Sequence, residues 1–151
     1  MIKPKYIWKP EIGYAGCTIH YDNLEFYGDA VCHPDDKDMM SRLTGQKIAE
    51  TRAMIQYLAH VRDFELRPQV RALRQLYFSM EHSKKFNKKS YEAKMLYRHI
   101  RATENDYIAI KQEIVRLKQE LKNYLNDKEE LFQIVRKKRV AKTQQSEINN
   151  S

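Results

Sequence analysis

The residues whose side chains can bind or react fall into two groups, and the first lies in the N-terminal third of the chain. Tyr27, His33, Asp35 and Asp36 follow one another closely, and Arg52 comes somewhat later. An arginine and a histidine beside an aromatic ring suit a nucleotide-like ligand, because the ring stacks on a base while the cations hold a phosphate. Arg52 also falls on an apolar stripe, where it needs an internal carboxylate (Asp35 or Asp36) or an anionic ligand.

The second group is basic and lies in the second half of the chain. Its lysines and arginines are interleaved with tyrosines, a pattern typical of proteins that bind single-stranded nucleic acid. The alternative is that they form the solvated side of a helical arm. The residues are Lys84, Lys85, Lys88, Lys89, Tyr91, Arg98 and Arg101, with Tyr97 beside them.

The sequence holds no recognisable catalytic or metal-binding motif. Its five histidines and two cysteines show no spacing suited to zinc, and there is no nucleophile elbow, phosphate-binding loop or calcium loop. Cys32 and His33 are neighbours in a predicted strand, so they point to opposite faces and cannot share one ion. We therefore predict a protein that binds rather than catalyses, with no cofactor and no metal.

A β-hairpin is predicted to position the first group. A two-residue turn at Asp22-Asn23 pairs Tyr21 with Leu24, Ile19 with Phe26, Cys17 with Gly28 and Ala15 with Ala30. This face is apolar or small and the opposite face is mostly polar, which favours a half-buried antiparallel pair. A lone hairpin is barely stable, so the following helix is expected to cover its apolar face. Cys17 and Cys32 lie several residues apart along this ladder, so both are predicted to be free and buried.

Helices are expected over the rest of the chain. One runs from about Thr44 or Gly45 to about Phe64, and a shorter one, at 69–82, begins beside Pro68. After an N-cap at Ser90, mostly apolar residues recur at alternating spacings of three and four positions, as in a coiled coil. The shorter helix covers only part of this seam, so a homo-oligomer, dimer or larger, is expected. The seam positions are Ala93, Leu96, Ile100, Thr103, Tyr107, Ile110, Ile114, Leu117, Leu121, Tyr124, Lys128, Leu131 and Val135.

Charge divides the chain unevenly. The formal net charge is +8; residues 1–64 carry eight Lys and Arg against nine Asp and Glu, and residues 65–151 carry twenty against eleven. Basic residues are densest from Arg136 to Lys142, and the polar end, 143–151, is predicted to be disordered. We therefore divide the chain into a hairpin–helix module (1–66), a helical hairpin or coiled coil (67–135) and a basic disordered tail (136–151). With no apolar run that could span a bilayer and no signal-peptide pattern, no membrane association is expected and the expected location is the cytoplasm.

One stretch resembles a known kind of protein. It runs from Phe26 to Asp36 and continues with Gly45, Ile48-Ala49 and Arg52-Ala53, and it is similar to a hairpin–helix module of small proteins from phages and mobile elements of low-GC bacteria. Within that group it resembles the phage Thoeris anti-defence family, whose members are non-enzymatic oligomers that sequester cyclic ADP-ribose signals at subunit interfaces. The resemblance implies that Phe26, Asp36 and Arg52 contact ligand. The remainder of the chain does not align with that family.

These observations predict an α+β fold, mostly α, with an N-terminal antiparallel β-hairpin packed on a helix and a long C-terminal helical or coiled-coil arm. The leading hypothesis is a phage-type accessory protein that blunts a bacterial defence by sequestering a cyclic nucleotide as an oligomer. Its ligand residues are Phe26, Tyr27, His33, Asp36 and Arg52. The alternative is an anti-CRISPR-like binder of a bacterial defence protein or nucleic acid through the basic arm. A third hypothesis is a structural coiled-coil protein of a virion.

Overall fold

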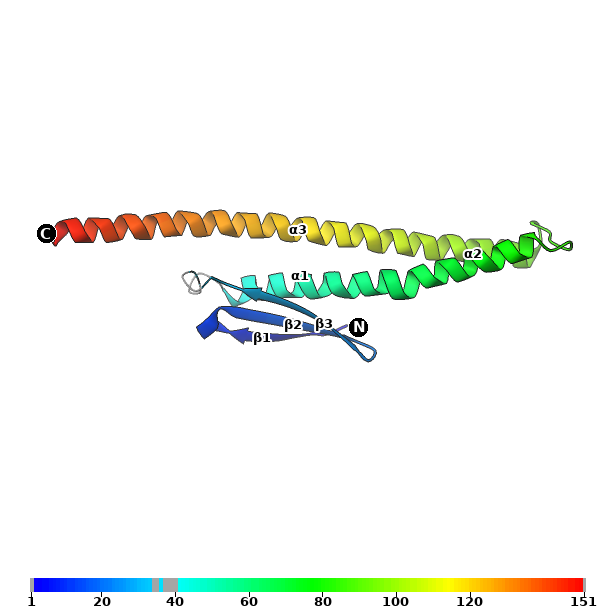
Figure 1. Cartoon of the computed structure of the whole chain (residues 1–151), viewed down its shortest axis with the longest axis horizontal. Helices are drawn as coiled ribbons and strands as arrows, with labels where there is room; N and C mark the ends of the chain where they lie inside the picture. The colour runs from blue at the N-terminus through cyan, green and yellow to red at the C-terminus, as the bar shows by residue number, and fades with distance from the viewer. Residues whose placement is uncertain (1, 34–35, 37–40, 151) are drawn as a thin grey trace. The chain divides into compact units, whose positions relative to one another are not determined.

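The computed structural model describes residues 2–33, 36 and 41–150, and its strands form one antiparallel sheet in the order β1-β2-β3 (Figure 1). Strands β2 (Tyr14–Tyr21) and β3 (Leu24–Val31) form the predicted hairpin. The predicted register is confirmed, with Cys17 opposite Gly28 and Ile19 opposite Phe26. Asp22 in the turn adopts a left-handed conformation (φ 52°), which aspartate tolerates better than most residues. Both cysteines are free and buried, as expected.

A third strand, β1 (Pro4–Lys9), was not predicted. It pairs with β2 so that Tyr6 lies opposite Cys17 and Trp8 lies opposite Ala15, on the same face of the sheet as those two residues. Pro4 is the first residue of this edge strand, a position where the missing N–H of proline removes no ladder hydrogen bond. Because β1 widens the apolar face, the sheet buries more apolar surface than the hairpin alone would.

Helix α1 (Arg42–His60) covers the apolar face of the sheet, as the sequence predicted. Ala49 and Ala53 are fully buried, and a side chain at Gly28 would collide with their backbone, so helix and strand approach closely at this point. The helix begins two to three residues earlier than predicted. The hydroxyl of Ser41, just before it, accepts a hydrogen bond from the Thr44 amide at 3.1 Å.

The shorter helix begins beside Pro68 as predicted, but no break separates it from the preceding helix. Instead, α1 is followed directly by a π-helical segment (Val61–Leu66) and then by α2 (Arg67–Glu81). Proline removes one helical hydrogen bond and its ring crowds the carbonyl four residues earlier. Here the wider π pattern, in which the Arg67 amide donates to the Arg62 carbonyl, absorbs this local misfit. The helix therefore changes its hydrogen-bond pattern without ending.

Helix α3 (Tyr91–Asn149) is longer than predicted. Its N-cap is Ser90, whose hydroxyl accepts a hydrogen bond from the Ala93 amide at 3.2 Å, as expected. At its other end it continues through the segment for which disorder was predicted. Residues 136–149 contain neither glycine nor proline, and most are tolerable or good helix formers, so nothing in that sequence stops the helix.

The chain divides into two compact units, which we describe separately. The sheet unit comprises Met1–Ala53 and Leu117–Ser151, and the helical-hairpin unit comprises Met54–Arg116. In the sheet unit, Leu121, Tyr124 and Leu125 of α3 pack against the sheet core. In the helical-hairpin unit, the buried residues of α3 are all seam positions: Ala93, Ile100, Thr103 and Ile114.

Each unit therefore covers its own part of the seam within one chain. Of the predicted seam positions only Leu131, 49% exposed, is open. The homo-oligomer was predicted because part of the seam was expected to lie uncovered in a single chain. The structure removes that reason, and the homo-oligomer stays an untested prediction.

We expect the thermal unfolding midpoint, followed by circular dichroism, to stay constant over about a hundredfold range of protein concentration, because the chain itself covers the predicted seam at every position except Leu131. A midpoint that rises steadily with concentration would contradict this and show that association stabilises the fold.

Crossing a bilayer requires a helix that is both long and continuously apolar, and none in the described part of the chain meets both conditions.

Candidate functional site

The structure separates the five residues predicted to bind a nucleotide signal. Phe26 lies in β3 opposite Ile19, on the side of the sheet that faces α1 and is half-buried. Tyr27, the next residue, points to the opposite face, is 56% exposed and donates its hydroxyl proton to Glu25. Strand alternation therefore places Phe26 and Tyr27 on opposite faces of the sheet, so the two side chains do not line one site.

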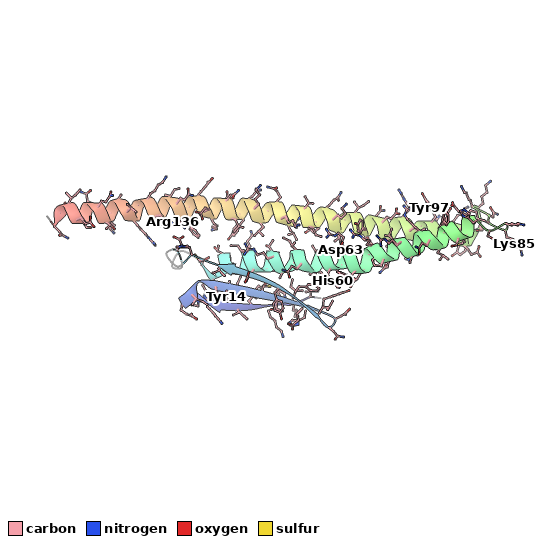
Figure 2. The ribbon with its side chains drawn as sticks, viewed as in Figure 1. Tyr14, His60, Asp63, Lys85, Tyr97 and Arg136 are labelled. Carbon is pink, nitrogen blue, oxygen red and sulfur yellow. The ribbon has the colours of Figure 1, made fainter. Side chains whose placement is uncertain are left out.

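His33, Asp36 and Arg52 do come together, in the sheet unit. They line a cavity of about 190 Å³ together with Arg136 of α3, which is labelled in Figure 2. Typical small-molecule sites enclose about 300–1,000 Å³, so this cavity is small for a whole nucleotide. Sequestration of a cyclic nucleotide there stays a prediction, and it requires the cavity to widen.

Asp36 and Arg136 form a two-point ion pair across this cavity. Arg136 Nε donates to Asp36 Oδ1 at 2.9 Å, Nη2 donates to Oδ2, and Nη1 donates to Glu129 at 3.2 Å. The Asp36 side chain is almost fully buried, with 1% of the residue exposed. These hydrogen bonds from Arg136 lower the pKa of Asp36 below its ordinary value of 3.8.

This ion pair changes the interpretation of Arg52. Asp36, one of its two expected internal partners, is occupied by Arg136, and Asp35 lies outside the described residues. Arg52 instead donates from Nη1 to the backbone carbonyl of Asp29 at 2.6 Å. This contact satisfies a carbonyl of the edge strand β3, so Arg52 also protects that edge from pairing with another chain.

We expect the Asp36–Arg136 pair to make the stability of the fold decrease at acidic pH. Because folding lowers the pKa of Asp36, the unfolded chain binds this proton more tightly. The pair's contribution is therefore present above the ordinary carboxyl pKa and is lost as pH falls through the lower folded value. The thermal midpoint of the wild type should fall between about pH 5 and pH 3, and that of Asp36→Asn should start lower and depend less on pH.

Asp22→Asn, the same chemical change in the exposed turn, is the matched control and should keep the wild-type pH profile. An Asp36→Asn profile as steep as that of the wild type would show that other carboxyls cause the acid sensitivity.

Neither cysteine environment favours a nucleophile in the sheet unit. Burial, with Glu50 nearby, raises the pKa of the Cys17 thiol to about 11, so this thiol stays protonated at neutral pH. Cys32 is part of the buried core cluster with Ala15 and Ala30.

The second predicted group gathers at one end of the helical-hairpin unit. We call residues 77–101, which comprise the end of α2, the connecting loop and the start of α3, the hairpin tip; Lys85 and Tyr97 mark it in Figure 2. The loop is ordered by local contacts, because the ring of Phe86 packs edge-on against Tyr77 and the Asn87 side chain accepts from the Lys89 amide. All seven predicted residues are exposed there: Lys84, Lys85, Lys88, Lys89, Tyr91, Arg98 and Arg101.

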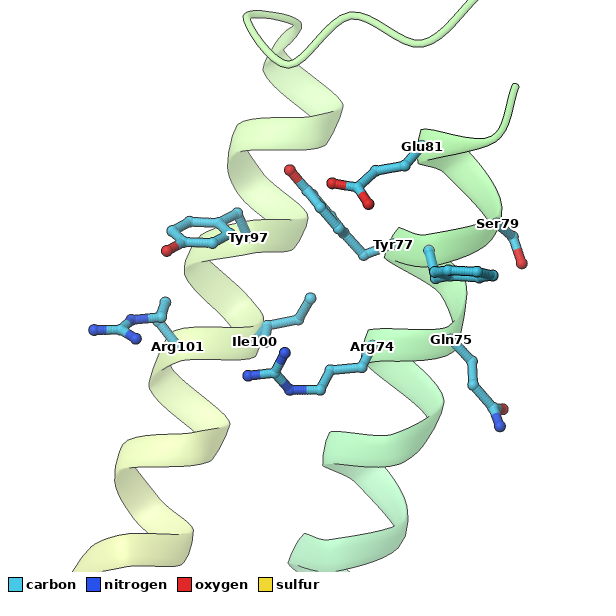
Figure 3. A pocket seen from close by; sticks show the side chains of 9 residues that line it. Arg74, Gln75, Tyr77, Ser79, Glu81, Tyr97, Ile100 and Arg101 are labelled. Atoms are coloured by element: carbon cyan, nitrogen blue, oxygen red, sulfur yellow. The ribbon is translucent and has the colours of Figure 1, made fainter. Parts of the chain in front are cut away.

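An aromatic groove of about 770 Å³ opens between α2 and α3 at the tip (Figure 3). Tyr77 and Tyr97 line it, with ring centroids 6.2 Å apart, and the same two rings line a second hollow of about 270 Å³. The groove is completed by Arg74, Gln75, Phe78, Ser79, Glu81, Ile100 and Arg101, and the second hollow by Lys88, Ala93, Lys94 and Arg98.

The cations of the tip have no carboxylate partner among the described residues, whereas two neighbouring arginines of α2 do. Arg74 pairs with Glu104, and Arg67 lies 3.3 Å from Asp63. By contrast, within the described part of the chain no ion pair is formed by Lys84, Lys85, Lys88, Lys89, Lys94, Arg98 or Arg101. Residues 67–101 carry ten Lys and Arg against two Glu, a net charge of +8 that equals the net charge of the whole chain.

The α2 side of the groove was not predicted as part of a site. None of Arg74, Tyr77 and Phe78 was singled out in the sequence as a site residue. The available signal was that Phe78 breaks the apolar spacing of α2, which leaves it exposed beside Tyr77. Tyr91 was predicted to take part but lines neither hollow.

No family model, curated protein or solved structure matches this chain.

Proposed function

We propose that the chain binds single-stranded nucleic acid at the hairpin tip. The observation that carries this proposal is the combination of seven cations that pair with no described carboxylate and a groove lined by Tyr77 and Tyr97. Cations that fold stability does not use are available for phosphates, and each phosphate bound releases counterions. The aromatic rings beside them, exposed at Tyr97 and half-buried at Tyr77, give unpaired bases a surface on which to stack.

The groove is what distinguishes this proposal from a merely solvated helical arm. Lysines on the wet side of a helix need no concave surface and no aromatic neighbours. Here the rings of Tyr77 and Tyr97 lie between Arg101 on one side and Lys94 and Arg98 on the other, as the two hollows that share these rings indicate. Such an arrangement matches a strand whose bases enter the groove while its phosphates follow the rim.

A duplex suits this surface less well, because its bases are stacked on one another and cannot reach the rings. An acidic protein surface also attracts the cations, but it offers no planar group for the tyrosines. Single-stranded nucleic acid uses both features of the tip, so we favour it over these two ligands.

Tyr97→Leu tests the stacking part of the proposal. We expect it to weaken binding of a fluorescent single-stranded oligonucleotide about tenfold in an anisotropy titration, because one base–ring contact is lost while every cation is kept. Tyr91→Leu is the matched control, since Tyr91 is 73% exposed but lines neither hollow, and it should bind like the wild type. Absence of binding by the wild type, or tighter binding of the matching duplex, would overturn the proposal.

A further inference from the structure

One residue of the groove is hard to reconcile with simple phosphate binding. Glu81 is the only carboxylate among the residues that line the groove, and it forms no ion pair with another described residue. It is also the last residue of α2, where the helix dipole disfavours a negative charge. An acidic side chain in this place repels phosphate and destabilises its own helix. Neither phosphate binding nor helix stability therefore explains why a glutamate stands here.

The direction of Glu81 indicates that role. Figure 3 shows Glu81 and Tyr77 pointing from α2 to the same side, toward α3. A base that stacks on the tyrosine rings therefore presents its edge to the carboxylate. The phosphates are then held by Arg101 in the groove and by Arg98 in the second hollow.

We propose that Glu81 selects guanine in a single strand; this inference rests on the proposed function. A carboxylate only accepts hydrogen bonds, and its two oxygens match two adjacent donors. Guanine alone among the bases presents such a pair, N1–H and the N2 amino group, on its Watson–Crick edge. Cytosine and adenine place a ring-nitrogen acceptor beside their amino group, and uracil and thymine flank their one N–H with two carbonyls, so each faces the carboxylate with a repulsive atom.

The same argument fixes the strand state of the ligand. The Watson–Crick edge of guanine is engaged in a duplex and becomes available only when the base is unpaired. Recognition through Glu81 therefore requires a single-stranded or looped segment. The tip would bind such segments broadly through its cations and prefer those that place a guanine in the groove.

The test uses the full chain and oligothymidine probes that differ only at one central base, which is guanine, inosine, adenine, cytosine or thymine. Inosine keeps N1–H but lacks the amino group, so it isolates one of the two hydrogen bonds. In anisotropy titrations we expect the guanine probe to bind about tenfold more tightly than the thymine probe, with inosine between them. Glu81→Gln should reduce the guanine preference to about twofold or less and should bind oligothymidine more tightly, because it removes a repulsive charge.

Glu92→Gln is the matched control, because it makes the same change of charge in the tip at a residue that lines neither hollow. It should keep the guanine preference. Binding of all five probes by the wild type with equal affinity would overturn the role of Glu81 and leave the proposed function standing. A guanine preference that persists in Glu81→Gln would also overturn it, and failure of every probe to bind would overturn the proposed function itself.

Discussion

Gly28→Ala is expected to destabilise the sheet unit by about 3 kcal/mol, although it adds a single methyl group. A Cβ at this position would lie 2.0 Å from the carbonyl oxygen of Ala49 and 2.5 Å from the amide nitrogen of Ala53. Both are backbone atoms of α1, so no side chain can rotate away and the helix itself has to move off the sheet. The loss is measured as the change in free energy of unfolding by chemical denaturation.

Gly16→Ala is the matched control for that experiment, because it also adds a methyl group to the central sheet. The three atoms nearest to its Cβ would all belong to the Tyr14 side chain, with the hydroxyl oxygen at 3.0 Å, and that ring can shift. We expect a change within about 1 kcal/mol of the wild type. Equal losses for the two substitutions would contradict the close contact between β3 and α1.

Arg98→Glu combined with Arg101→Glu is expected to lower affinity for a single-stranded oligonucleotide by about a hundredfold or more at moderate salt, because each change replaces a phosphate contact by repulsion. Both side chains are exposed and form no ion pair with a described residue, so the fold should be retained. Titrations at several salt concentrations should also give a log–log slope that is shallower by about 1.4.

The control for the double variant is Lys137→Glu combined with Lys138→Glu, which changes the net charge equally on the exposed C-terminal part of α3. It should keep most of the affinity. If both double variants lose affinity alike, binding follows the overall charge of the chain and not the hairpin tip.

The parts of the fold that could be predicted are those with a short-range repeat. Alternation on both sides of Asp22-Asn23 specifies the register of β2 and β3, because a slip of one residue would expose Ile19 and Cys17. Spacings of three and four likewise specify which face of α3 is buried. Strand β1 escaped prediction because Tyr6-Ile7-Trp8 has no clear alternation, and its pairing depends on β2 as a template.

Contacts between distant segments left no such signal. Asp36 and Arg136 are one hundred positions apart, and nothing near either residue indicates its partner. The segment that packs on the α3 seam could not be predicted either. The apolar spacing of a helix is the same whether the segment that buries it belongs to the same chain or to another.

The candidate site was predicted in part for the same reason. Residues 84–101 carry seven Lys and Arg against one Glu, so this clustering is visible in the sequence. The groove needs α2 beside α3, and that brings Arg74, Tyr77 and Phe78 together with residues 19 to 27 positions later. Phe26 and Tyr27, which were predicted to share a ligand site, lie on opposite faces because neighbouring residues of a strand alternate.

Photocrosslinking tests the central claim most directly. A single-stranded oligonucleotide that carries iodouracil is irradiated with the full chain, and the crosslinked peptide is identified by mass spectrometry. We predict crosslinks at Tyr77, Phe78 or Tyr97, whose side chains line the groove, and their loss in the Arg98→Glu and Arg101→Glu variant. Crosslinks confined to the sheet, for example at Tyr14 or Tyr27, or to residues 136–149 of α3, would contradict the assignment of the hairpin tip as the nucleic-acid site.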